Sequence, residues 1–112
     1  MQKGEVYRNE RLVGIVSKEN GEYQFIYDQG YLNDPSALPI SVGLPLQDVG
    51  YVSPILFPFF ANMLAEGSAK TIQCRALRID ENDLFTRLLK TTASNTIGSI
   101  TIKEVGNNED KS

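Results

Sequence analysis

The sequence predicts an α+β domain, in which a small antiparallel β-sheet carries about three short helices packed on one face. Two β-rich runs near the N-terminus flank an Asn-Gly pair, helical spacings follow in the middle, and one alternating run lies near the C-terminus. Strands and helices grouped in this way, instead of alternating, are typical of α+β folds. A chain of 112 residues suffices for one hydrophobic core. We therefore expect a single domain over residues 1–105 and a polar, disordered segment over residues 106–112.

The clearest local pattern is a β-hairpin near the N-terminus. Two β-rich runs, residues 12–16 and 22–27, lie on either side of Asn20 and Gly21. Both turn residues tolerate the positive φ of a tight primed turn. An earlier strand around Val6 is expected to pair with the first arm. Alternate residues of the second arm share one face and should be buried: Tyr23, Phe25 and Tyr27.

The segment after the hairpin changes character twice. Residues 29–50 are rich in Pro, Gly, Asp and Asn, which predicts a loop with at most short or edge strands. Ser53 followed by Pro54 is a plausible helix start, which predicts a first helix over residues 54–65. Pro58 lies near the end of its first turn, so this helix is expected to begin later or to bend.

Two further helices and a final strand complete the predicted fold. A helix over residues 69–78, capped by Ser68, has apolar residues at three- and four-residue spacing. A helix over residues 82–91 follows Asp80 and Asp83, which resemble a capping pair. The alternation of residues 97–102 predicts a strand that returns to the sheet. The expected stripes are Ala69, Ile72, Ala76 and Ile79 in the first of these helices, Leu84, Phe85, Leu88 and Leu89 in the second, and Gly98, Ile100 and Ile102 in the strand.

Composition excludes several classes of function. Eleven Lys and Arg stand against 14 Asp and Glu, so the net charge of −3 disfavours unaided nucleic-acid binding. The absence of His and the presence of one Cys remove the commonest general base, a thiolate metal site and an internal disulfide. No apolar run approaches the ~18 residues of a membrane helix, and residues 1–5 do not resemble a secretory signal. We expect a cytoplasmic, non-enzymatic protein without metal or cofactor.

The chain's densest carboxylates are Asp80, Glu81 and Asp83. Paired carboxylates serve acid–base catalysis or divalent ions, but acidic residues at a helix N-terminus also interact favourably with the helix dipole. The second interpretation is favoured. Cys74 has no His to activate it, so a packed thiol is expected rather than a nucleophile.

Basic and aromatic residues also allow two interpretations each. A short basic stretch without an intervening acid contains Lys70, Arg75 and Arg78. It fits contact with phosphate or with an acidic partner. A solvated helix face is the favoured interpretation. The aromatic set fits either base stacking or, as favoured, a hydrophobic core. That set is Tyr23, Phe25, Tyr27, Phe57, Phe59 and Phe60.

Several segments of the chain match one family in order. Residues 40–46, ISVGLPL, are similar to an S-x-S-L-P-L segment, and residues 57–64, FPFFANML, are similar to F-x-F-F-x-N-L-L. Residues 65–67, AEG, and 96–102, TIGSITI, follow, the last being similar to a closing G-A-V-T-L strand. With the opening strand and the hairpin that contains Gly14, this succession resembles the N-terminal subdomain of HipA-family serine/threonine kinases. The resemblance covers about residues 4 to 104.

The resemblance implies a binding function. A free-standing copy of this subdomain resembles HipS, the small component of HipB-HipS-HipT toxin-antitoxin systems. The resemblance implies that this chain is a non-catalytic, antitoxin-like regulator, which docks on a HipT/HipA-type kinase and restrains it. No ATP-binding loop or catalytic Asp can be carried over. The hypothesised contact residues lie around the turn between the first two helices: Met63, Ala65, Glu66, Gly67, Ser68, Lys70 and Gln73.

An alternative function and one departure from the family accompany this expectation. The alternative is an assembly module that links the kinase to a HipB-like DNA-binding protein without inhibiting it. Family members often carry L-P-E-G followed by a bulky residue, where this chain reads LAEGS over residues 64–68. The small side chains of Ser68 and Ala69 argue against inhibition by insertion of a large residue into an active site.

Overall fold

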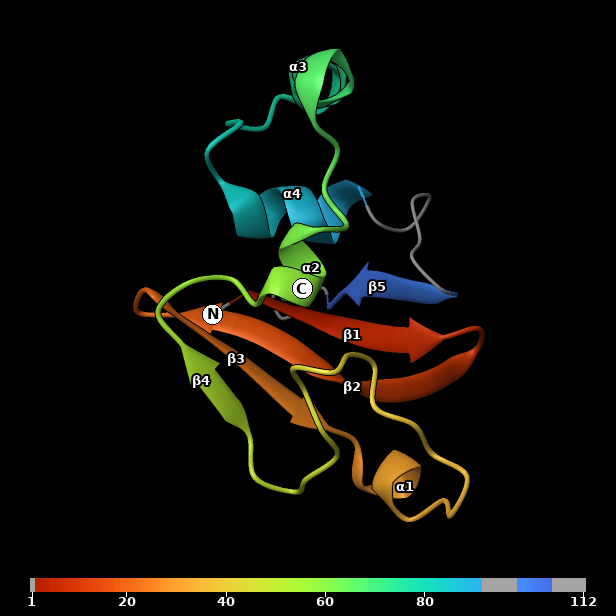
Figure 1. The fold of residues 1–112 in the computed structure, drawn as a ribbon. Coiled ribbons are helices and arrows are strands. Elements are labelled where there is room, and N and C mark those ends of the chain that lie inside the picture. Colours follow the sequence, from red (N-terminus) through yellow and green to blue (C-terminus); the bar gives the residue numbers. More distant parts are fainter. Residues whose placement is uncertain (1, 92–98, 106–112) are drawn as a thin grey trace, which may run out of the picture.

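A five-stranded antiparallel sheet forms the body of the protein (Figure 1). A computed structural model describes residues 2–91 and 99–105. The strands lie in the order β4-β3-β2-β1-β5, and each neighbouring pair is antiparallel. This arrangement confirms the predicted α+β class. The strands are β1 (Gln2–Arg8), β2 (Arg11–Glu19), β3 (Glu22–Tyr27), β4 (Tyr51–Ser53) and β5 (Ile100–Glu104).

The predicted hairpin is confirmed as β2 and β3. Asn20 and Gly21 connect the strands with φ values of 55° and 80°, as a primed turn requires. β2 extends beyond the predicted 12–16, and the expected earlier strand is β1, which pairs with β2 along its length.

The strand predicted near the C-terminus is confirmed for the residues that the structure describes. Ile100 and Ile102 are almost fully buried and β5 pairs with β1, on the side of β1 opposite to β2. The first and last strands of the described chain are therefore neighbours. Residues 97 and 98 of the predicted strand, and the expected disordered segment 106–112, lie outside the described residues.

Among the described residues there are four helices: α1 (Gln29–Leu32), α2 (Pro58–Ala61), α3 (Gly67–Leu77) and α4 (Leu84–Thr91). α4 matches its prediction. The side chain of Asp83 accepts hydrogen bonds from the Thr86 amide at 3.2 Å and the Thr86 hydroxyl at 2.8 Å, so the acidic residue caps the helix. Its apolar stripe is buried at Phe85, Leu88 and Leu89 and half-buried at Leu84.

The prediction of a helix over residues 54–65 was wrong in extent. The helix α2 has only four residues and begins at Pro58. A proline disfavours helical backbone in the residue before it, and Phe57 is accordingly extended, with φ −57° and ψ 135°. The Ser53 hydroxyl accepts from the Ile55 amide at 3.1 Å, so it closes a local turn instead of capping a helix.

The predicted loop over residues 29–50 contains one short helix, α1, which the composition did not reveal. Asp28 caps it by accepting from the Tyr31 amide at 3.2 Å. Part of the loop then folds over the sheet, because the Tyr27 hydroxyl donates to the carbonyl of Leu44 and accepts from the amide of Ile40 at 3.1 Å.

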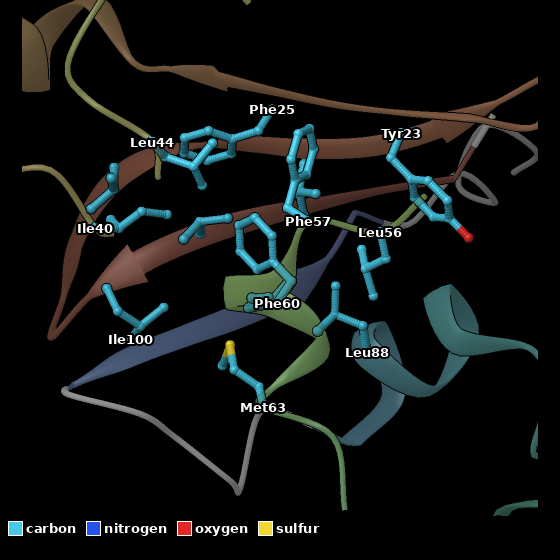
Figure 2. Packing of buried hydrophobic residues seen from close by; sticks show 14 of the residues in the cluster. Tyr23, Phe25, Ile40, Leu44, Leu56, Phe57, Phe60, Met63, Leu88 and Ile100 are labelled. Carbon is cyan, nitrogen blue, oxygen red and sulfur yellow. The ribbon is translucent and has the colours of Figure 1, made fainter. Parts of the chain in front are cut away.

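The hydrophobic core lies between one face of the sheet and a cover formed by α2, α4 and the loop around Ile40 and Leu44 (Figure 2). Phe25 of the sheet contacts Phe60 of α2, with ring centres 5.6 Å apart. Phe59 is partly buried against this cluster. The core interpretation of the aromatic set is thus confirmed, and the buried members are Tyr23, Phe25, Tyr27, Phe57 and Phe60.

Candidate protein-binding site

The helix α3 stands away from the sheet, with α4 between them (Figure 1). Cys74 is the one buried residue of α3, at 2% exposure. The expected stripe faces solvent instead: Ile72 is 68% exposed, and Ala69 and Ala76 are also exposed. Helical periodicity revealed a stripe correctly, but it does not show whether another layer covers that stripe.

The turn that leads into α3 is on the surface. Glu66, Gly67 and Ser68 are exposed, and Ala65 is half-buried. Gly67 has a φ of 65°, a conformation that glycine adopts without strain. The prediction that Ser68 caps the helix was wrong, because Glu66 occupies the cap position and makes no side-chain cap hydrogen bond.

A buried arginine binds the segments on both sides of α3. Arg87 of α4 is only 4% exposed, and its guanidinium donates to the Ala65 carbonyl at 2.7 Å and the Glu81 carbonyl at 3.2 Å. Ala65 precedes α3 and Glu81 follows it. Within the described chain, no carboxylate lies within ion-pair distance of Arg87. The acceptors of its guanidinium are therefore backbone carbonyls.

The structure brings together only some of the predicted contact residues. Met63 is 5% exposed and points into the core (Figure 2), so its side chain is not presented to a partner. Gln73 is half-buried, and its buried Oε1 has no hydrogen-bond partner among the described residues. Lys70 lies 3.9 Å from the carboxylate of Glu81. The residues that share the exposed turn are Ala65, Glu66, Gly67 and Ser68.

Apart from Ser68, sequence reasoning assigned no binding role to a group of side chains that α3 exposes on one side. Ser68, Ala69, Ile72, Arg75 and Ala76 are all exposed, and we call this set the outer face of α3. The basic stretch was the one available signal, since it contains Arg75. Arg87 had no such signal, because a cation in an amphipathic helix normally marks the solvent side.

The other charged groups of interest form local contacts. A hollow of about 570 Å³ near the β1–β2 turn is lined in part by Arg8, Arg11 and Tyr31. The Arg11 guanidinium donates to Asp34 and lies 5.1 Å from the centre of the Tyr31 ring. That hydrogen bond, together with those from Ser36, lowers the pKa of Asp34 from 3.8 to about 2. Arg11 is therefore largely occupied by an internal partner.

The described part of the chain contains neither a metal-binding cluster nor a membrane-spanning helix. Over residues 2–91 and 99–105, no group of three or more His, Cys, Asp or Glu side chains is placed to hold a metal ion. Within the same ranges, no helix has the length and apolar character needed to cross a membrane. Cys74 is buried, as expected for a packed thiol.

Fold and site together define a small α+β domain whose projecting turn and helix form the candidate binding surface. The chain belongs to the HipA N-terminal domain family, whose model matches residues 4–103. Its structure is similar to a solved N-terminal domain of HipA toxin, with a TM-score of 0.70 and 28% sequence identity, over 96% of this chain and 95% of that one.

Two curated relatives differ in length. An uncharacterised protein of Haemophilus influenzae is 29% identical over 104 residues, which cover 93% of each chain. A putative kinase of Sinorhizobium fredii, Y4mE, is 29% identical over 84 residues, which cover 74% of this chain but only 20% of the kinase. Similar domains therefore occur both in a protein of comparable length and within a much longer one.

Proposed function

We propose that this protein is a non-catalytic, antitoxin-like regulator that binds a HipA-type serine/threonine kinase and restrains it. The observation that carries this proposal is the turn Ala65–Ser68. Its polar and small residues Glu66, Gly67 and Ser68 are exposed, and it leads into α3, which stands away from the sheet (Figure 1). Such a turn can enter a cleft of a partner without disturbing the sheet.

The comparisons support a kinase as the partner. A domain similar to this chain makes up about one fifth of a putative kinase, and another is named as part of the HipA toxin. A domain that reaches such a kinase as a separate chain can dock on the surface that its covalently joined counterpart occupies. The kinase then makes the same contacts with a separate protein, and the bound fraction depends on the concentration of that protein.

Reversing two charges tests the function. We expect the double variant Glu66→Lys, Lys70→Glu to lose binding to the cognate HipA-type kinase and to lose relief of its toxicity on co-expression, because paired charges across an interface become repulsive. The matched control, Lys3→Glu with Glu22→Lys, reverses the same charges at two exposed positions of the sheet.

Each result of this experiment is decisive. If the folded double variant still binds the kinase and relieves toxicity, the turn is not the docking surface. If the wild-type protein binds the kinase without relieving toxicity, the assembly role with a HipB-like protein replaces the regulatory role. If the wild-type protein does not bind the kinase, both roles are refuted.

A further inference from the structure

The outer face of α3 is exposed in the described chain and carries one large apolar side chain among small and polar ones. Ile72, at 68% exposure, is at its centre. The small side chains of Ser68, Ala69 and Ala76 surround it, and all three are exposed. A single exposed apolar residue needs no explanation, but an isoleucine among small neighbours lets another surface approach the helix closely.

The helix α3 and the two residues that follow it carry a local positive charge. Residues 67–79 contain Lys70, Arg75 and Arg78 and no Asp or Glu, in a chain whose net charge is −3. Lys70 has a weak ion pair with Glu81 at 3.9 Å. Arg75 and Arg78 are exposed, and no described carboxylate lies within ion-pair distance of either. Two guanidinium groups thus remain available to an external acid.

We propose that the outer face of α3 docks in an apolar groove with an acidic rim on the HipA-type kinase. The inference rests on the proposed function and deepens it, because it extends the contact from the turn to the helix and states the chemistry of the surface that receives it. Ile72 is the apolar anchor and Arg75 pairs with an acidic side chain at the rim. An amphipathic helix in a groove uses anchors at this spacing, with Ala69, Ile72 and Ala76 on one side of the helix.

The structure also explains why this helix can serve as a rigid contact. Arg87 of α4 binds the carbonyls of Ala65 and Glu81, in the segments before and after α3, so these bonds help to fix the orientation of the outer face before binding. Preorganisation of this kind lowers the entropy that a complex loses on forming. The same helix contributes little to the core, so its outward residues are free to be selected for binding.

The test is binding of the full chain to the purified cognate kinase, measured by biolayer interferometry. We expect Ile72→Glu with Arg75→Glu to weaken affinity by about 100-fold or more, because an interface anchor and a charge pair are both lost. The matched control, Val42→Glu with Lys3→Glu, changes the net charge equally at exposed sites elsewhere, Val42 being 97% exposed. Its affinity is expected to stay within about threefold of the wild type.

A second variant keeps the test valid if the double variant unfolds. Ile72→Ala preserves the helix and is expected to weaken binding about tenfold. If the wild type binds but both α3 variants bind within threefold of it, the inference is wrong and the proposed function stands. Equal losses in the α3 variant and the control would also refute the inference, because net charge alone would then govern affinity. Absence of wild-type binding would refute the proposed function itself.

Discussion

Replacing Arg87 with Met is expected to loosen α3 without disrupting the sheet. The methionine side chain keeps much of the apolar stem but donates no hydrogen bond, so the carbonyls of Ala65 and Glu81 lose their partner. Because Cys74 is the one buried residue of α3, few other contacts hold this helix. The opening of α3 and the unfolding of the whole domain should therefore be separable processes.

The size of the effect follows from opposing contributions. Hydrogen bonds to a charged group contribute roughly 1.5–3 kcal/mol each, and Arg87 makes two of them. Against this, Arg87 is 4% exposed and its Nε has no hydrogen-bond partner among the described residues, and burial of a cation costs several kcal/mol. We expect a net loss of about 1–2 kcal/mol, which corresponds to about 5- to 30-fold faster exchange of the α3 amides.

Amide hydrogen exchange read by NMR measures this, with Leu88→Ala as the control. Leu88 is fully buried in the core, and its truncation should cost about 2–5 kcal/mol. It should accelerate the slowest sheet amides at least 30-fold while leaving the α3 amides within about threefold. Unchanged α3 exchange in Arg87→Met would show that Arg87 does not hold the helix. Equal acceleration of α3 and sheet in Leu88→Ala would show that α3 opens only with the whole domain.

Three further predictions address stability, titration and ligand binding. Gly14→Ala should lower the free energy of unfolding in urea by about 1–3 kcal/mol, because the new Cβ would lie 2.4 Å from the carbonyl oxygen of Ile26. In Gly43→Ala the new Cβ would meet only the Ser41 hydroxyl oxygen, at 3.9 Å, so equal stability of the two variants would contradict this prediction. Asp34 should titrate by NMR with a pKa of about 2, so its stabilising contribution is complete above about pH 4 and is lost as the pH falls through 2, and Arg11→Gln should raise that pKa. Calorimetry with ATP and magnesium should give no binding, and micromolar affinity would reveal an unrecognised site.

Most of the sheet could be predicted because its signals are local. The Asn20-Gly21 turn and the alternation of β3 specify a hairpin without reference to the rest of the chain. The apolar stripe of α4 was equally clear, since Phe85, Leu88 and Leu89 are all buried. The helix predicted over residues 54–65 was less well defined, because Pro58 indicated either a later start or a bend, and the structure shows the later start.

The candidate site was less predictable because it depends on which helix surfaces are left uncovered when the chain folds. The spacing of Ala69, Ile72 and Ala76 is the same for a buried stripe and for an exposed one. Only the position of α3 relative to α4 distinguishes the two. Likewise the acceptors of Arg87 are backbone carbonyls, and every residue type provides one, so no sequence pattern marks them.

The pairing of the first strand with the last has a consequence for how the protein is made. Arg8 pairs with Ile100 at the opposite end of the described chain, and synthesis at about 5–20 residues per second separates them by roughly 5 to 20 seconds. During that time β1, β2 and β3 can form a meander, but the free edge of β1 cannot be covered. Contacts between residues so distant in sequence slow folding, and an open strand edge invites pairing with other chains. β5 thus covers this edge of β1 late in synthesis and itself becomes the new edge of the sheet. It is a shorter strand than β1 and ends in the charged residues Lys103 and Glu104, features that disfavour pairing with other chains.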